Sequence, residues 1–161
     1  MNTKVLTVDQ LADRSNELRR AGKKLVVTNG CFDLLHVGHI RYLQAARARG
    51  DALAVGLNGD ASVQALKGAH RPINSEGDRA EVVAALECVS FVAVFPEVRA
   101  TDFLRAVRPA VYVKGGDYKP ETLNPEERAA LIEIGAAIEI IPFEAGYSTT
   151  GIVERLNQGP E

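Results

Sequence analysis

The stretch Asn29-Gly30-Cys31-Phe32-Asp33-Leu34-Leu35-His36-Val37-Gly38-His39 decides how this chain folds. It follows a short apolar, β-branched run at 25–28, which is typical of a buried strand. It leads into residues 40–50, whose pattern predicts a helix closed by a terminal glycine. The stretch is therefore a strand-to-helix turn. In an open α/β sheet, ligands bind at such turns, beyond the carboxyl ends of the strands.

The two histidines of this turn suit a phosphate group. His36 and His39 are three residues apart at the start of a helix, so their side chains share one face. A helix N-terminus already favours anions through its free N–H groups and its dipole. Gly30 and Gly38 allow close approach of backbone or ligand. The alternative is that Gly30 only makes a turn and the histidines are polar surface residues. The H-x-G-H spacing, together with the resemblance described below, favours the phosphate site.

Apolar runs alternate with helical patterns along the rest of the chain. The patterns predict strands at 24–29, 52–57, 91–95, 110–113 and 137–142. They predict helices at 7–22, 37–49, 75–88, 101–107, from 124 onward and at 149–156, with N-caps at Thr7, Ser75, Asn124 and Ser148. Residues 60–73 are expected to be a short polar–apolar segment and a loop. Most strands are continuous apolar runs, which predicts a five-stranded parallel sheet with helices on both faces.

Five loops are expected to meet at one edge of this sheet, because parallel strands end on the same side. They are 30–39, 58–72, 95–98, 114–120 and 143–150, and they carry the basic residues His36, His39, Lys67, His70, Arg71, Lys114 and Lys119. Such an edge suits a polyanion, for example a nucleoside triphosphate with a phosphorylated partner. The alternative is that loops carry charge because they are wet, and Asp60, Asp117 and Glu121 dilute the positive sign.

Other candidate residues follow from their chemistry. Lys67 and Arg71 flank a glycine, and their side chains suit phosphate, although surface ion pairs are an alternative. Asp117 could accept hydrogen bonds from hydroxyl groups or help to hold Mg²⁺, but glycine–aspartate turns are common. Ser148-Thr149-Thr150 is first of all a helix cap, whose hydroxyls can also bind phosphate. Further candidates are Asn58, Asp60 and Arg79.

Several functions are disfavoured. The sequence lacks the G-x-G-x-x-G, P-loop and G-x-S-x-G motifs, so dinucleotide-dependent hydride transfer, P-loop kinases and serine hydrolases of that type are not indicated. Cys31 and Cys88 are far apart, so we expect no disulfide framework, and Cys88 is expected in the core. A nucleophilic role for Cys31 is not required by any mechanism considered.

The turn N-G-x-F-D-x-L-H-x-G-H resembles the signature of the H-x-G-H nucleotidyltransferase superfamily. Three further blocks make the sequence similar to the adenylyltransferase domains of bacterial ADP-heptose synthases over about residues 25–156. They are Leu66-Lys67-Gly68 with Arg71-Pro72, Lys114-Gly115-Gly116-Asp117-Tyr118-Lys119-Pro120, and Ser148-Thr149-Thr150. K-G-G-D-Y is the more specific block, because related cytidylyltransferases tend to differ there. Two-domain members also carry a sugar kinase, which we do not find here, so a stand-alone adenylyltransferase is expected.

The resemblance implies a Rossmann-like domain that transfers the adenylyl group of ATP to D-glycero-β-D-manno-heptose 1-phosphate and releases pyrophosphate. It implies Mg²⁺ bridging the phosphates, held mostly by substrate oxygens and water, with no protein ligand assigned. On this basis we expect catalytic roles for His36, His39 and Lys67, and substrate or phosphate binding by Arg71, Asn58, Asp60 and Arg79. The expected nucleotide pocket comprises Gly30, Cys31, Phe32, Asp33, Gly38, Gly115, Asp117, Ser148, Thr149 and Thr150.

Length and composition fit one globular domain. The chain has 161 residues, 46% hydrophobic and 25% charged, and we expect an N-terminal helix within 1–23, a catalytic core at 24–156 and a tail at 157–161. A net charge of −2 argues against a nucleic-acid partner, and no apolar run is long enough for a membrane span. Met1–Asp9 has no signal-peptide core, so a cytoplasmic protein is expected. The resemblance also suggests a homodimer or a larger homo-oligomer.

Two other functions stay open at this point. One is a cytidylyltransferase acting on glycerol 3-phosphate or a related alcohol phosphate, because the base pocket is shaped largely by backbone. The other is a non-catalytic nucleotide-binding module, against which the intact His36, His39 and Lys67 argue.

Overall fold

A single parallel sheet runs through the computed structural model, which describes residues 2–116 and 119–159. Its strands are β1 (Val5–Leu6), β2 (Leu25–Gly30), β3 (Ala52–Asn58), β4 (Phe91–Phe95), β5 (Val111–Gly115) and β6 (Ala137–Ile141), in the order β1-β4-β3-β2-β5-β6. The parallel α/β sheet is confirmed, but it has six strands, and the prediction of five was wrong. The missed strand, β1, pairs Val5 with Val92. Two residues are too few to show a strand periodicity.

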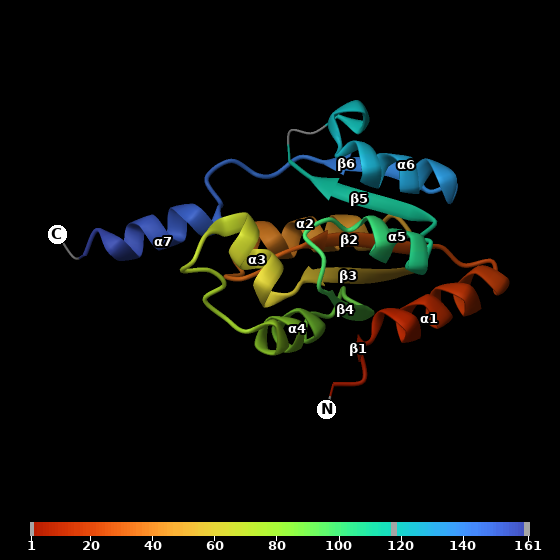
Figure 1. The fold of residues 1–161 in the computed structure, drawn as a ribbon, viewed down its shortest axis with the longest axis horizontal. Coiled ribbons are helices and arrows are strands. Elements are labelled where there is room, and N and C mark those ends of the chain that lie inside the picture. Colours follow the sequence, from red (N-terminus) through yellow and green to blue (C-terminus); the bar gives the residue numbers. More distant parts are fainter. Residues whose placement is uncertain (1, 117–118, 160–161) are drawn as a thin grey trace.

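Seven α-helices and one 3₁₀ turn connect these strands in the described part of the chain (Figure 1). They are α1 (Val8–Arg20), α2 (Val37–Arg47), α3 (Asp60–Lys67), α4 (Glu76–Ala84), α5 (Thr101–Val107), η1 (Pro120–Thr122), α6 (Pro125–Glu133) and α7 (Thr149–Asn157). The expected N-caps are confirmed, because the side chains of Thr7, Ser75, Asn124 and Ser148 each accept a backbone N–H.

The segment after β3 differs from the prediction. A short polar–apolar segment and a loop are expected over 60–73, whereas residues 60–67 form α3, of which Lys67 is the last residue. This helix buries only Ser62 and Val63. An isolated helix of eight residues is marginal in water, and so short a segment offers only about two turns from which a helical period can be recognised.

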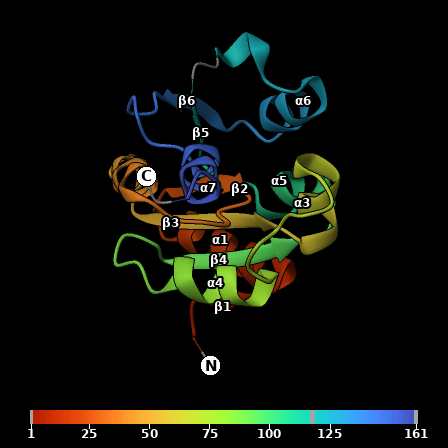
Figure 2. The ribbon, with the colours of Figure 1, turned by 90° about the vertical axis from the view of Figure 1, so that its left-hand side faces the viewer.

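Helices cover both faces of the sheet, as expected for a parallel sheet. On one face α2 and α4 pack on alternate strand residues, with Val26, Leu53 and Val92 fully buried. On the other face α1, α5 and α6 do the same, with Val27, Ala54 and Ala93 fully buried. Figure 2 shows these two layers from the side, with α7 in front of the middle of the sheet. None of the helices in residues 2–116 and 119–159 is long and apolar enough to cross a membrane.

The strand order creates a crevice between β2 and β5. After β2 the chain builds outward through β3 and β4, and it then returns to the other side of β2 to form β5 and β6. In doubly wound sheets the carboxyl ends of the strands at such a reversal of order are the usual ligand site. Here those ends are Gly30 of β2 and Gly115 of β5.

Candidate active site

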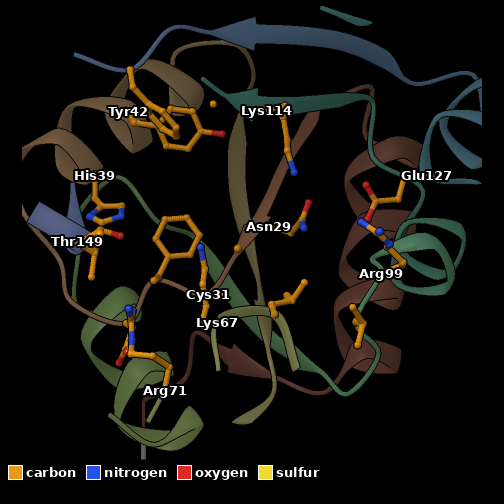
Figure 3. A pocket seen from close by; sticks show the side chains of 18 residues that line it. Asn29, Cys31, His39, Tyr42, Lys67, Arg71, Arg99, Lys114, Glu127 and Thr149 are labelled. Carbon is orange, nitrogen blue, oxygen red and sulfur yellow. The ribbon is translucent and has the colours of Figure 1, made fainter. Parts of the chain in front are cut away.

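A pocket of about 450 Å³ occupies this crevice (Figure 3). All five loops expected at the carboxyl edge contribute to it, so the prediction that they meet is confirmed. The lining residues are Asn29, Gly30, Cys31, Phe32, Asp33, His39, Tyr42, Leu66, Lys67, Arg71, Val98, Arg99, Lys114, Gly115, Glu127, Phe143, Thr149 and Thr150. Its size is within the range of about 300–1,000 Å³ that is common for small-molecule sites.

Asp33 joins the turn after β2 to the segment 71–74. Its side chain is fully buried and accepts hydrogen bonds from Arg71 Nε (2.8 Å), the Ile73 N–H (2.8 Å) and the Asn74 N–H (2.9 Å). Burial alone would raise the pKa of this carboxyl, but these hydrogen bonds outweigh it and hold the pKa below the usual value of 3.8. Asp33 is therefore a charged anchor for the pocket wall, with both oxygens occupied.

A second buried group, Arg79, links three segments behind the pocket. Its side chain is fully buried and donates to the carbonyl oxygens of Cys31 (2.7 Å) and Asn74 (3.1 Å) and to Asp60 Oδ1 (2.8 Å). A buried guanidinium in this position stabilises the turn geometry. Arg79 does not line the pocket, and its contacts in the structure are those that hold the Cys31 turn.

His39 lines the pocket, with its ring centroid 4.0 Å from that of His36. Its Nδ1 accepts the backbone N–H of His36 (3.2 Å), so we assign the ring proton to Nε2. Burial, and to a smaller extent the neighbouring His36, lowers the pKa of His39 to about 4. At neutral pH His39 is an uncharged imidazole with one N–H left for a ligand.

His36 lies behind His39, between its ring and the segment before α7. The His36 and Tyr147 rings stack with centroids 6.2 Å apart, and burial lowers the pKa of His36. His36 Nδ1 is buried and has no hydrogen-bond partner within the described residues. A Cβ on Gly38 would come within 2.9 Å of both the His36 ring and Tyr147 Cβ, so only glycine permits this close packing.

The N-terminus of α7 approaches that of α2 at the histidine end of the pocket. Thr149 Oγ1 donates to the carbonyl oxygen of Leu34 (2.9 Å), and Ser148 caps α7 by accepting the Gly151 N–H. Phe143 closes this side by an edge contact with the Tyr42 ring, at 5.8 Å between centroids. Two helix N-termini thus border one pocket, an arrangement that favours anions.

Asn29, at the middle of the pocket, has a fixed orientation. Tyr112, a fully buried residue of β5, donates its hydroxyl hydrogen to Asn29 Oδ1 at 2.6 Å. The Asn29 Nδ2 donors are therefore directed to the other side of the amide. Tyr42, which also lines the pocket, donates to the Val113 carbonyl oxygen at 3.2 Å, and burial raises its pKa to about 12. Tyr42 remains protonated at neutral pH, and both tyrosines act as rigid supports.

The residue after Cys31 has an unusual backbone. Phe32 has φ +47°, a left-handed conformation that is strained for a bulky side chain. Its buried ring lies 5.5 Å from that of His39 and also packs against Gly30. Burial raises the pKa of the Cys31 thiol, the opposite of what a nucleophilic thiolate requires.

The predicted site residues fall into three groups. Those that line the pocket are Gly30, Cys31, Phe32, Asp33, His39, Lys67, Arg71, Gly115, Thr149 and Thr150. Those that are placed outside the lining are His36, Gly38, Ser148, Asn58, Asp60 and Arg79. Asn58 donates to backbone oxygens of Glu97 and Val98 (3.4 Å each), so its role in the structure is to hold the loop after β4. Asp117 lies outside the described residues.

Sequence reasoning did not assign pocket roles to five lining residues with distinctive side chains: Asn29, Tyr42, Arg99, Glu127 and Phe143. Asn29 belongs to the strand-to-helix turn at 29–39, where no pocket role was assigned to it. Glu127 lies near the start of the helix expected from residue 124 onward and had no other predicted role. No signal along the chain brings Glu127 to the pocket, because this depends on the packing of α6 against α5.

The described residues contain no group of three or more histidine, cysteine or acidic side chains arranged to hold a metal ion. The two carboxylates of the pocket lining are Asp33 and Glu127, and both oxygens of Asp33 already accept hydrogen bonds. The side chains therefore do not form a metal cage by themselves.

Comparisons with known proteins identify a family. A family model described as cytidylyltransferase-like matches residues 27–155. The chain is 48% identical over 158 residues to the bifunctional protein HldE of Geotalea uraniireducens, and 47% identical over 156 residues to that of Syntrophotalea carbinolica. These alignments cover 98% and 96% of this chain but 32% and 31% of the relatives, so the chain spans about a third of their length.

A solved structure gives the same picture of the fold. The crystal structure of the lipopolysaccharide core biosynthesis protein from Thermoplasma volcanium is similar with a TM-score of 0.63 and 25% sequence identity. The match covers 76% of this chain and 98% of that protein.

Proposed function

Because the chain belongs to the cytidylyltransferase-like family, we propose that it transfers the adenylyl group of ATP to a sugar 1-phosphate. The proposed products are a nucleoside-diphosphate sugar and pyrophosphate, and the proposed acceptor is D-glycero-β-D-manno-heptose 1-phosphate. The observation that carries the proposal is the histidine end of the pocket, where His39, Lys67 and two helix N-termini surround one space. Relatives named HldE at 40–48% identity support the same acceptor class.

The reaction needs charge stabilisation more than acid–base chemistry. An oxygen of the sugar phosphate attacks the α-phosphorus of ATP, the bond to the β-phosphate bridging oxygen breaks, and its electron pair leaves with pyrophosphate. No bond to the protein forms. The protein aligns the two reactants and stabilises the charge that develops on the α-phosphate and the leaving group.

The residues divide this work by their chemistry. The neutral His39 donates its Nε2 proton as a hydrogen bond to a phosphate oxygen, and His36 holds His39 in that orientation through its backbone N–H. Lys67, exposed at the end of α3, supplies a mobile positive charge for the β- and γ-phosphates. The N-terminus of α7, with Thr149 and Thr150, binds further phosphate oxygens.

Mg²⁺ would neutralise the triphosphate when bound. Since the described side chains offer no cage for it, we propose that the ion is held mainly by nucleotide oxygens and water. We place the reaction in the cytoplasm, where ATP is available, and we retain a homodimer or larger homo-oligomer as part of the proposal.

A pyrophosphate-release assay tests the proposed function. Purified protein with Mg²⁺ is given ATP or CTP, each with heptose 1-phosphate, other sugar 1-phosphates or glycerol 3-phosphate. We expect turnover with ATP and a sugar 1-phosphate. Preference for CTP with glycerol 3-phosphate would favour the alternative cytidylyltransferase. Nucleotide binding without turnover of any acceptor would favour a non-catalytic module.

A further inference from the structure

The end of the pocket opposite the histidines contains a buried carboxylate. Glu127, in the first turn of α6, is only 6% exposed and yet lines the pocket. Its Oε1 accepts the backbone N–H of Ala100 at 2.9 Å, which caps the start of α5. Its Oε2 accepts no hydrogen bond from the part of the chain that the structure describes. The capping role therefore accounts for one oxygen only.

A carboxylate in this position is unexpected in a pocket that binds phosphates. Asp33, the other lining carboxylate, is fully engaged by Arg71 and backbone N–H groups. Glu127 is therefore the lining carboxylate that presents an oxygen to a ligand. It would repel a phosphate group placed against it. In Figure 3, Glu127 and Arg99 lie across the pocket from His39 and Thr149, which keeps the negative charge away from the phosphate end.

Donor groups line the same end and the middle of the pocket. Arg99 directly precedes Ala100, whose N–H Glu127 accepts, and Figure 3 shows Arg99 at the Glu127 end of the pocket and Asn29 and Lys114 between the two ends. The amide of Asn29 is fixed by Tyr112 so that its N–H donors are free of that contact. A hydroxyl group is both a donor and an acceptor. A carboxylate acceptor that lines one pocket together with guanidinium and amide donors is therefore suited to a row of hydroxyl groups.

We propose that Glu127, with Arg99 and Asn29, binds the hydroxyl groups of the acceptor and sets the preference for a polyhydroxylated sugar phosphate. This inference rests on the proposed function, because it assigns the acceptor to the end of the pocket that phosphate groups avoid. The burial of Glu127 strengthens its discrimination. An acceptor without the matching hydroxyl leaves a buried charge unpaired, which costs more than a lost contact at the surface.

The test separates binding from folding by two substitutions at one position. Glu127→Gln keeps the side-chain size and the Oε1 acceptor for Ala100, but it replaces the charged oxygen by an amide donor. We expect the KM for the sugar 1-phosphate to rise about 10- to 100-fold, the effect of losing a hydrogen bond to a charged group. The dissociation constant for ATP, measured by calorimetry, and Tm should stay at their wild-type values. Glu127→Ala should lower Tm as well, because it also removes the cap.

Glu126→Gln is the matched control, since this exposed residue is on the same turn of α6 and does not line the pocket. It should leave all three quantities unchanged. An unchanged KM in Glu127→Gln, or an equal loss of ATP affinity, would overturn the inference even if the wild-type protein uses sugar 1-phosphates. Wild-type turnover of glycerol 3-phosphate alone, with CTP, would overturn the proposed function. If that turnover is also insensitive to Glu127→Gln, the hydroxyl site is excluded independently.

Discussion

Two arginine–carboxylate pairs tie segments that contribute to the pocket to the rest of the molecule, and they differ in burial. Arg71 and Asp33 meet at 2.8 Å with side chains 18% and 0% exposed. Arg41 and Glu144 also form an ion pair, but their side chains are 51% and 48% exposed. The first pair is reinforced by three further hydrogen bonds between the Asp33 residue and Ile73 and Asn74. The second connects α2 to an exposed segment before α7.

This difference in burial distinguishes a fixed wall of the pocket, at segment 71–74, from a wall that can move, at segment 142–148. Segment 71–74 is tied to the turn after β2 through a buried charge, so its geometry is set before any substrate arrives. Residues 142–148 are all exposed, and α7 has no buried residue. In Figure 1 α7 extends away from the sheet. A segment with so few buried contacts opens at low free-energy cost. The wall at 71–74 is charged and in place before substrate binds, and the wall at 142–148 can open. An enzyme that binds two anionic substrates one after the other can use both features.

The largest effect is expected from removing the carboxylate of the fixed wall. Asp33→Ala leaves the Arg71 guanidinium and two backbone N–H groups without their partner, which should cost about 3–5 kcal/mol of unfolding free energy. For a chain of this size that corresponds to a fall in Tm of about 6–20 °C. Calorimetric melting at pH 7 checks this.

Asp33→Asn provides a version of the same test that preserves shape. Because the folded-state pKa of Asp33 is depressed, its stabilisation is present above the unfolded value of about 3.9 and is lost as the pH falls through the folded value. Wild-type Tm should therefore fall more steeply than that of Asp33→Asn below about pH 4. Parallel curves would show that Asp33 is not a charged anchor.

The fixed wall is also the region that the sequence predicted best. The apolar run of β2, the glycines and the H-x-G-H spacing are all local signals, and they located the turn, the start of α2 and the pocket edge. Local patterns failed for β1 and α3, where two and eight residues hold their structure through packing. Nothing in the sequence indicated the internal hydrogen bonds of Arg79 and Asn58, since a polar side chain held inside the protein and one that binds a ligand look alike in sequence.

The second prediction concerns His39, the side chain that the fixed turn presents. His39→Ala should lower kcat by about 10²–10³-fold, the usual effect of removing one donor to transition-state charge. Tm should change little, because the ring is partly exposed at the pocket surface. His36→Ala is the paired variant. It keeps the backbone N–H that His39 Nδ1 accepts but removes the ring packed 4.0 Å from that of His39, and we expect kcat to fall because the His39 ring loses this packing. Near-normal kcat in both would show that the histidines are not catalytic.

The third prediction concerns the pH at which His39 takes up a proton. Its pKa of about 4 lies below the ordinary 6.5, so the free protein keeps the neutral ring throughout the range above about pH 5. The acid limb of kcat/KM, which reports the free enzyme and free substrates, should therefore show no transition near pH 6.5 that depends on His39. The folded state binds fewer protons than the unfolded state between these two values, so this group makes stability fall as the pH drops from 6.5 to 4. A transition centred near 6.5 that His39→Ala removes would contradict the lowered pKa of His39.

The smallest effect is expected from breaking the exposed pair on the other wall. Glu144→Ala should leave Tm within about 1 °C of wild type, because exposed ion pairs contribute little to stability. The segment itself should respond more, since Arg41 also lies 5.8 Å from the Tyr147 ring and Tyr147 stacks on His36. We expect amide hydrogen exchange at 143–150 to be faster in Glu144→Ala than in the wild-type protein. Adding ATP and Mg²⁺ should slow exchange at 143–150 in the wild type and in the variant. Exchange at 71–74 should be the same in all of these samples. Arg14→Ala, which removes a comparably exposed pair with Glu17 on α1, should alter exchange at neither segment. If ATP slows exchange at 71–74 as strongly as at 143–150 in the wild-type protein, both walls close around the nucleotide. In that case the difference in burial between the two arginine pairs does not correspond to a difference in mobility between the two walls.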